Sequence, residues 1–130
     1  MRGNELTGRL FYIYGEPSDR VYELGKRLSQ YLGCEHIDLA FISRWPVHEK
    51  ISHIKREMIS GCVISGDIRG WGNELQKHVE YGFEVISRSN LSDRPFANWL
   101  PCFYSSWLLV EDSIDRNMEI MKKLLSTVLD

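Results

Sequence analysis

The chain has 130 residues, which is enough for one domain with a sizeable core and too few for two ordinary domains. Acidic and basic residues are interleaved and the formal net charge is -2, so the chain offers no basic field to a nucleic-acid backbone and we expect no polynucleotide partner. It contains no run of about 18 apolar residues that could span a bilayer, and its polar start lacks the apolar segment of a secretory signal. We therefore expect a cytoplasmic protein without a membrane partner.

The cysteines and histidines are scattered along the chain. Cys34, Cys62 and Cys102 form no Cys-x-x-Cys or Cys/His ligand spacing. We therefore predict reduced thiols, with Cys62 inside a strand, and neither a metal site nor a bound cofactor.

The first unit of the chain is a strand, a loop and a helix. Residues 10–15 form an apolar run that ends in glycine, which predicts a buried strand. Pro17, Ser18 and Asp19 are typical of a helix start. The helix itself is predicted because apolar residues recur at helical spacing: Val21, Leu24, Leu28 and Leu32.

This unit lacks the residues of a phosphate-binding loop. A GxxxxGK[ST] loop that starts at Gly15 needs a second glycine, a lysine that neutralises phosphate and a hydroxyl that holds magnesium. The chain has Arg20, Val21 and Tyr22 at those positions. We expect the strand-loop-helix geometry to be kept and the chemistry to be lost.

Two strands and a helix are predicted in the middle of the chain. Residues 35–42 are predicted to form the second strand. Pro46 suits a first helical turn, and the helix that follows ends near Gly61; its apolar stripe consists of Val47, Ile51, Ile54 and Met58. Residues 62–65 are apolar and bounded by glycines, which predicts a central strand covered on both faces.

A third helix is predicted to carry Trp71, Leu75 and Val79 on one face and to end at Gly82, since glycine suits the left-handed position after a helix. Residues 83–87 are predicted to form the fourth strand.

Periodicity disappears in residues 88–106, where turn-forming residues predict a long irregular connection. Its aromatic residues indicate that it packs on something. Residues 107–110 are predicted to form the last strand. A closing helix, capped by Asp112 or Ser113, has this apolar seam: Ile114, Met118, Met121, Leu125 and Val128.

Strand-like and helix-like segments therefore alternate along the whole chain. This pattern predicts an α/β fold, a three-layer sandwich in which a mostly parallel five-stranded sheet is flanked by helices. We expect residues 1–130 to form a single domain with a lid-like loop over about 88–106.

The order of these elements resembles that of the P-loop nucleoside monophosphate kinases, and within them the phage-type deoxynucleoside monophosphate kinases. The resemblance rests on Gly15 after the first strand and on the segment 67–69 (DIR) after the third. Asn73 and Glu74, Gly82 and the strand that ends before Arg88 follow in the order of that family. The resemblance implies a P-loop kinase-like fold and a phage source.

In the resembling kinases, the residues that match Asp67 and Arg69 line the substrate and phosphate region, and arginines of the lid contact phosphates. The candidate nucleotide-binding residues are therefore Gly15, Ser18, Arg20, Asp67, Arg69, Arg88 and Arg94. Each has another explanation. Gly15 is also what a tight turn requires, Asp67 and Arg69 could form a structural ion pair, and the other arginines could be surface charges.

The aromatic residues of the irregular loop are candidates for contact with a protein partner: Phe96, Trp99, Phe103 and Tyr104. Trp71 and Trp99 could also stack on a base, but large aromatic residues in such domains are more often core or interface.

We expect a nucleotide-kinase-like protein that has lost phosphoryl transfer and acts by binding a nucleotide or another protein, because transfer relies on positioning and charge neutralisation. One alternative is an active small nucleoside monophosphate kinase or nucleotide-processing enzyme that uses Arg20, Arg69, Arg88 and Arg94 in place of the lysine. A subunit of a larger assembly, including a homo-oligomer, is a third possibility.

Overall fold

The computed structural model describes residues 6–90, 96, 99 and 101–129. Its elements follow one another in the order β1 (Leu10–Gly15), α1 (Ser18–Leu32), β2 (Glu35–Asp38), α2 (Val47–Met58), β3 (Cys62–Ser65), α3 (Asn73–Gln76), β4 (Val79–Ile86), the 3-10 helix η2 (Arg88–Asn90), β5 (Ser105–Val110) and α4 (Ile114–Leu129).

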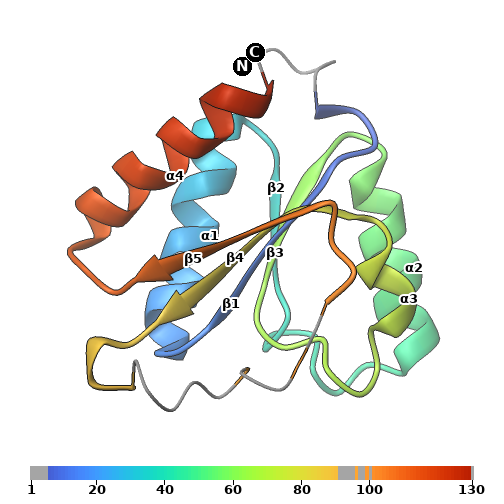
Figure 1. The fold of residues 1–130 in the computed structure, drawn as a ribbon. Helices are drawn as coiled ribbons and strands as arrows, with labels where there is room; N and C mark the ends of the chain where they lie inside the picture. Colours follow the sequence, from blue (N-terminus) through green and yellow to red (C-terminus); the bar gives the residue numbers. More distant parts are fainter. Residues whose placement is uncertain (1–5, 91–95, 97–98, 100, 130) are drawn as a thin grey trace.

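The strands form one five-stranded sheet in the order β2-β3-β1-β4-β5, and every pair of neighbours is parallel. Helices α1 and α4 cover one face of the sheet, and α2 and α3 lie on the other (Figure 1). The predicted α/β three-layer sandwich is confirmed.

The two faces of β1 show how the sequence builds these layers. Side chains of a strand alternate between its faces. Phe11 and Ile13 therefore point toward α1 and α4, and Tyr12 and Tyr14 point toward the side of α2 and α3. All four are almost fully buried, so an uninterrupted apolar run is what this middle strand requires.

Strand β3 was predicted to be central and covered on both faces. Its residues are all buried and it lies inside the sheet, but the middle position belongs to β1. Cys62 is a free thiol within this strand, and Cys34 and Cys102 are free as well.

The second strand is shorter than predicted, because β2 ends at Asp38 instead of residue 42. The Asp38 carboxylate accepts a hydrogen bond from the backbone N–H of Ala40 at 3.1 Å, and the N–H of Leu39 donates to the carbonyl of Ser65 at 2.9 Å. These bonds turn the chain away from the sheet edge.

The third helix was also predicted wrongly. Helix α3 contains only Asn73–Gln76, and Val79 and Gly82 belong to β4. Gly82 does not end a helix. The ring of Phe103 lies over it, and a Cβ atom at position 82 would come within 2.5 Å of that ring.

The last part of the chain follows the prediction more closely. Strand β5 contains the predicted residues 107–110, and α4 starts behind Ser113, whose hydroxyl accepts a hydrogen bond from the N–H of Arg116 at 3.1 Å. Ser113, rather than Asp112, is thus the cap. Across the described residues, the structure contains no helix with the length and apolar character needed to cross a membrane.

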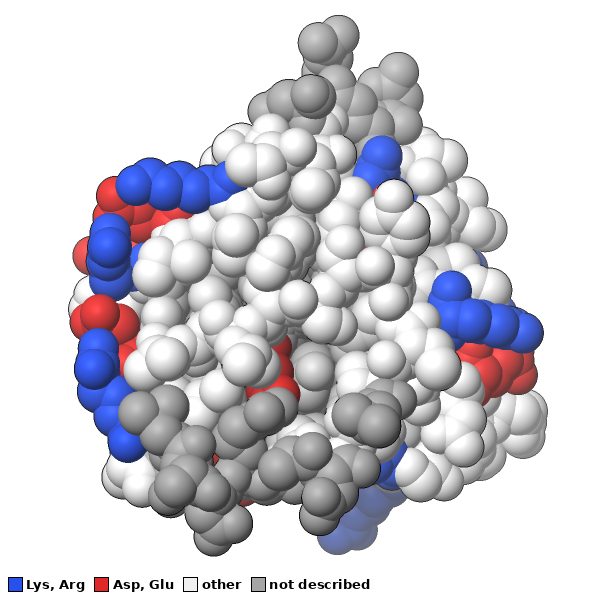
Figure 2. Space-filling view, in the orientation of Figure 1, with Lys and Arg blue, Asp and Glu red and all other residues white. Residues whose placement is uncertain are grey.

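Charged side chains gather at the margins of the face seen in Figure 2, whereas its centre is mostly uncharged. Strand β5 lies at the edge of the sheet, and Leu108 and Val110 on it are 56% and 40% exposed. Tyr104, just before the strand, is 80% exposed. The edge strand therefore presents apolar side chains to solvent.

Candidate functional site

A pocket of about 360 Å³ opens at the carboxyl ends of β1, β2 and β3. It is lined by Gly15, Glu16, Ser18, Val21, Tyr22, Asp38, Leu39, Ala40, Ser43, Lys50, Ser65, Gly66, Asp67, Arg69, Trp71 and Phe96. Among the predicted nucleotide-binding residues, Gly15, Ser18, Asp67 and Arg69 are brought together here.

The pocket lies where the topology leaves a crevice. After β1 the chain enters α1 on one face of the sheet, and after the neighbouring strand β3 it enters the turn and α3 on the other face (Figure 1). Ligands of open α/β sheets bind outside the carboxyl ends of the strands at such a switch point. The sheet order therefore favours this place for a binding site.

The connection between β1 and α1 is short. Only Glu16 and Pro17 separate the two elements, so positions 18–20 are already helical. Gly15 has φ 116°, and a Cβ atom there would come within 2.1 Å of the Val85 carbonyl oxygen. The glycine is thus required by the close approach of β1 to β4, and a long loop around a triphosphate is not formed.

The amino end of α1 faces the pocket through Ser18 and carries no side-chain cap. Pro17 occupies the cap position and makes no side-chain hydrogen bond. The first N–H groups of a helix lack intrahelical partners and carry a partial positive charge, which attracts anions. Two carboxylates oppose this attraction: Asp19 Oδ1 accepts a hydrogen bond from the N–H of Arg20 at 2.9 Å, and Glu16 lines the pocket.

Lys50 is the main feature of the pocket that the sequence analysis did not identify. Its side chain lines the pocket although the residue is only 7% exposed, and its Nζ atom lies 4.5 Å from the centroid of the Trp71 ring. Among the described residues, its ammonium group makes no hydrogen bond or ion pair. One signal was present in the sequence: Lys50 stands four positions before Ile54 and so falls on the apolar stripe of α2.

Asp67 and Arg69 form an ion pair with each other, which is the second of the two explanations that the sequence allows for these residues. Arg69 Nη2 lies 2.8 Å from Asp67 Oδ2, and Arg69 Nε lies 3.0 Å from Oδ1. The backbone N–H of Arg69 also donates to Asp67 Oδ1 at 2.9 Å, and its guanidinium group lies 3.7 Å from the centroid of the Phe96 ring. Both side chains are half exposed at the mouth of the pocket.

Asp67 and Arg69 shift each other's pKa. Partial burial raises the pKa of the Asp67 carboxyl, but the hydrogen bonds and charge of Arg69 outweigh it and hold that pKa below its ordinary value. The hydrogen bond to Asp67 raises the pKa of Arg69 in turn. Each group therefore stabilises the charged form of the other.

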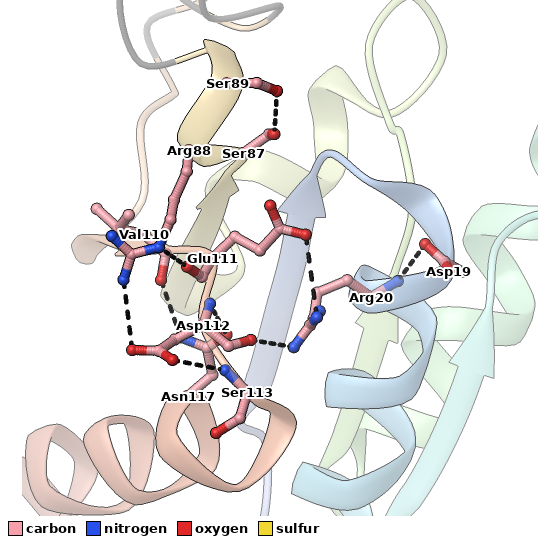
Figure 3. A network of polar contacts seen from close by, with 10 residues as sticks. All are labelled: Asp19, Arg20, Ser87, Arg88, Ser89, Val110, Glu111, Asp112, Ser113 and Asn117. Carbon is pink, nitrogen blue, oxygen red and sulfur yellow. Dashed lines mark hydrogen bonds and ion pairs between the residues drawn. The ribbon is translucent and has the colours of Figure 1, made fainter.

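Arg20 and Arg88 meet elsewhere, at the start of α4 (Figure 3). Arg88 Nε donates to the carbonyl of Glu111 at 2.8 Å, and Arg88 Nη2 lies 3.4 Å from Asp112 Oδ2. Arg20 donates to the carbonyl of Asp112 and lies 3.9 Å from the Glu111 carboxylate. Neither arginine lines the pocket, and Arg94 lies outside the described residues.

The aromatic residues predicted to contact a partner mostly pack inside the protein. The rings of Phe96, Trp99 and Phe103 lie edge-on to Tyr14, with centroids 5.1, 5.4 and 6.0 Å away. They cover the α2 and α3 side of β1. Of the four, Tyr104 alone is largely exposed.

A polar pair beside the pocket was not predicted. His36 Nε2 lies 2.8 Å from the hydroxyl of Ser65, and burial lowers the pKa of His36. Gly25 of α1 packs directly on this pair, because a Cβ atom there would come within 2.7 Å of His36 Nε2. The pair links β2 to the carboxyl end of β3.

The acidic side chains that line the pocket are Glu16, Asp38 and Asp67, and the basic ones are Lys50 and Arg69. Because Arg69 is paired with Asp67, Lys50 is the cation left without an anionic partner among the described lining residues. Within the same part of the chain, no group of histidine, cysteine and acidic residues is arranged to hold a metal ion.

Comparison of the chain with models of protein families, with curated proteins and with solved structures finds no match. The kinase resemblance accordingly stays a prediction, and the geometry of the pocket is the basis for a functional proposal.

Proposed function

We propose that this protein is a nucleotide-kinase-like binding protein that holds a small nucleotide in the pocket at the ends of β1, β2 and β3 and does not transfer phosphoryl groups. The observation that supports this is that the pocket lies at the switch point of the sheet and is lined by the start of α1 and by the aromatic side chains Tyr22 and Trp71. Its volume lies within the range of small-molecule sites, about 300–1,000 Å³.

The alternative, an active kinase, has less support. Phosphoryl transfer from a triphosphate depends on positioned cations. Val21 is buried in the core and Tyr22 follows it where lysine and a small hydroxyl residue would serve that chemistry. Arg20 and Arg88, which could replace the lysine, are engaged with Glu111 and Asp112.

Two measurements on the purified protein test this proposal. Calorimetric titration with dAMP, dCMP, dGMP and dTMP is expected to show binding of at least one of them. A coupled assay with the same nucleotides, ATP and magnesium is expected to show no turnover. Turnover that is lost in Arg69→Ala would contradict the binding-only function, and no binding of any of the four would contradict nucleotide binding itself.

A second proposed function is self-association through β5, and the exposed apolar residues of this edge strand support it. An uncharged edge strand without proline lacks the usual protection against pairing with another chain, and Leu108 and Val110 are exposed on it. The occupant would be a second copy that pairs β5 with β5 around a twofold axis. Light scattering over a range of concentrations tests this: a dimer that becomes monomeric in Leu108→Lys supports it, and a monomer at every concentration excludes it.

A further inference from the structure

We propose that the groove beside the edge strand β2 binds an organic cation with a quaternary ammonium group, such as choline, and that aromatic rings and the Asp38 carboxylate hold it. This inference goes beyond nucleotide binding and does not depend on it. It starts from a groove of about 310 Å³ whose lining comes from α1, β2, α2 and the connection between β2 and α2.

Three exposed aromatic side chains line this groove. Tyr22 comes from α1, and Phe41 and Trp45 come from the connection between β2 and α2. Phe41 is 84% exposed, and the other two rings are exposed as well. A single exposed apolar side chain needs no explanation, but several that gather around one hollow are typical of an interaction site. Ile37 and Ile42 complete the apolar part of the lining.

Two of the rings are supported by neighbouring side chains. The Tyr22 ring packs on the ring of His36, with centroids 5.5 Å apart, and the Trp45 ring packs on that of His53 at 5.3 Å. The backbone N–H of Trp45 also donates to the carbonyl of Ile42 at 3.0 Å, which fixes the turn that carries the ring. Rings that are already held in place lose little freedom when a ligand binds.

The charge of the groove favours a cation. Asp38 supplies a carboxylate, which accepts a hydrogen bond from the N–H of Ala40 at 3.1 Å and forms no ion pair with a described residue. No lysine or arginine is among the described residues that line the groove, and Lys26 of α1 lines a different groove, between α1 and α4. Burial lowers the pKa of His36 from 6.5, so this lining ring is uncharged at neutral pH. A bound cation would therefore gain a carboxylate partner.

A quaternary ammonium group is the cation that suits this lining best. Aromatic faces attract cations, and aromatic cages are the usual protein sites for choline and methylated lysine. A primary ammonium is strongly hydrated, whereas the methyl groups of the quaternary cation are apolar and match Ile37 and Ile42. The groove is large enough to enclose a whole molecule of the size of choline, which favours a free compound over the tip of a lysine side chain.

The test compares choline with two analogues in NMR titrations of the wild-type protein. Aromatic rings shift the methyl resonances of a cation that lies on their faces, so the ligand reports its own position. Dimethylbutanol, in which carbon replaces the nitrogen, keeps the shape without the charge, and ethanolamine keeps the charge without the methyl groups. At about pH 8, where histidine side chains are mostly neutral, we expect choline to bind about 10-fold more tightly than either.

Variants of the groove assign the binding to its residues. Trp45→Leu replaces a ring by an aliphatic side chain and should weaken choline binding by about 2- to 30-fold, the range for one cation–π contact. Trp45→Phe keeps a ring and should retain part of the affinity. Asp38→Asn should weaken the binding of choline but not that of dimethylbutanol, because only choline is charged.

Two matched controls separate these effects from general ones. Tyr104→Leu removes an exposed ring that does not line the groove, and Glu35→Gln removes an exposed carboxylate of the same strand β2 that does not line it either. Both should bind choline like the wild type. Trp45→Leu should also leave nucleotide affinity unchanged, because Trp45 does not line the pocket at the ends of β1, β2 and β3.

The proposal is wrong if choline does not bind, if dimethylbutanol binds as tightly as choline, or if folded Trp45→Leu and Asp38→Asn both bind choline like the wild type. A further titration with acetylated trimethyllysine amide checks the source of the cation. Tighter binding of this derivative than of choline would contradict a free small molecule as the ligand. Each of these outcomes leaves the proposed nucleotide binding untouched.

Discussion

The hydroxyl of Tyr12 accepts a hydrogen bond from the backbone N–H of Ile68 at 3.1 Å, across 56 positions of the chain. The same hydroxyl donates to the carbonyl of Gly66 at 2.7 Å. Tyr12 is fully buried in the middle strand, and Gly66 and Ile68 flank Asp67 at the pocket. One side chain of β1 thus holds the turn after β3 in place.

Tyr12→Phe should therefore lower the free energy of unfolding by about 1–3 kcal/mol, because it leaves a buried N–H without its partner. Urea denaturation measures the effect. Tyr31→Phe is the matched control, since Tyr31 is 44% exposed and its hydroxyl makes no hydrogen bond with the described residues. Equal losses in the two variants would show that the hydroxyl of Tyr12 does not stabilise the turn.

The stability of the protein should fall at alkaline pH. Burial raises the pKa of Tyr12 well above its ordinary value of 10.0, and it raises the pKa of Cys62 from 9.0 to about 12. Above the unfolded-state values the unfolded chain loses protons that the folded protein keeps, so the free energy of unfolding decreases as pH rises. The decrease should begin near pH 9.0 with the thiol and steepen above pH 10.0 with the phenol.

Urea titrations between about pH 8 and about pH 11 measure this decrease. In Cys62→Ala the part that begins at the lower pH should become smaller, and in Tyr12→Phe the part at the higher pH. An unfolding free energy that is flat across this range would contradict the burial of both groups.

The two glycines at the ends of β1 and α1 should respond differently to alanine. Gly33 has φ 75°, and no atom lies within 4 Å of the place that an alanine Cβ would take, so Gly33→Ala should cost only the left-handed backbone, about 1–2 kcal/mol. Gly15 has φ 116°, outside the left-handed region open to alanine, and Gly15→Ala adds a clash with the Val85 carbonyl oxygen, so it should cost more. Urea denaturation of both variants compares them, and a Gly15→Ala protein as stable as Gly33→Ala would contradict the close approach of β1 and β4.

The sequence predicts the layers well because the buried strands are apolar on both faces. The runs at 10–15 and 62–65 match β1 and β3 to the residue, because both runs are short and apolar and end at or next to a glycine, as is typical of a covered strand. The third helix failed for a physical reason. Position 82 requires glycine because the ring of Phe103 lies on it. A contact between residues 21 positions apart leaves no local signal in the sequence.

The candidate site was predicted only in part. Asp67 and Arg69 reach the pocket because they follow the carboxyl end of a parallel strand, a position that topology alone determines. Arg20 and Arg88 were predicted to belong to the same site. Their partners Glu111 and Asp112 come from the turn before α4, and no spacing in the sequence indicates this contact. Lys50 was overlooked because lysines usually lie in solvent.

Acid should also destabilise the protein. The loss of stability should begin at a higher pH than the titration of the carboxyl groups would cause. Burial lowers the pKa of His36 from 6.5. The unfolded chain therefore takes up a proton below about pH 6.5 that the folded protein resists, and the stability due to neutral His36 is lost as pH falls. Urea denaturation should show a declining unfolding free energy below that pH. The slope should shrink in His36→Gln, and an unchanged slope would assign the decline to another group.

Asn117 ties the end of β5 to the start of α4 (Figure 3). Its Nδ2 donates to the Val110 carbonyl at 3.1 Å, its Oδ1 accepts from the Asp112 N–H at 3.2 Å, and the residue is fully buried. Asn117→Ala leaves both backbone groups unpaired and should cost about 1–3 kcal/mol in urea denaturation.

The exposed neighbour Arg116 provides the control for this change. Its ion pair with Glu119 lies on the surface at 3.4 Å, so Arg116→Ala should change stability by less than about 1 kcal/mol. Because Arg20 and Arg88 bind the same turn and stand outside the pocket lining, Asn117→Ala should leave monophosphate affinity unchanged. A folded Asn117→Ala protein that no longer binds the monophosphate would instead place these arginines among the ligand contacts and move the site toward α4.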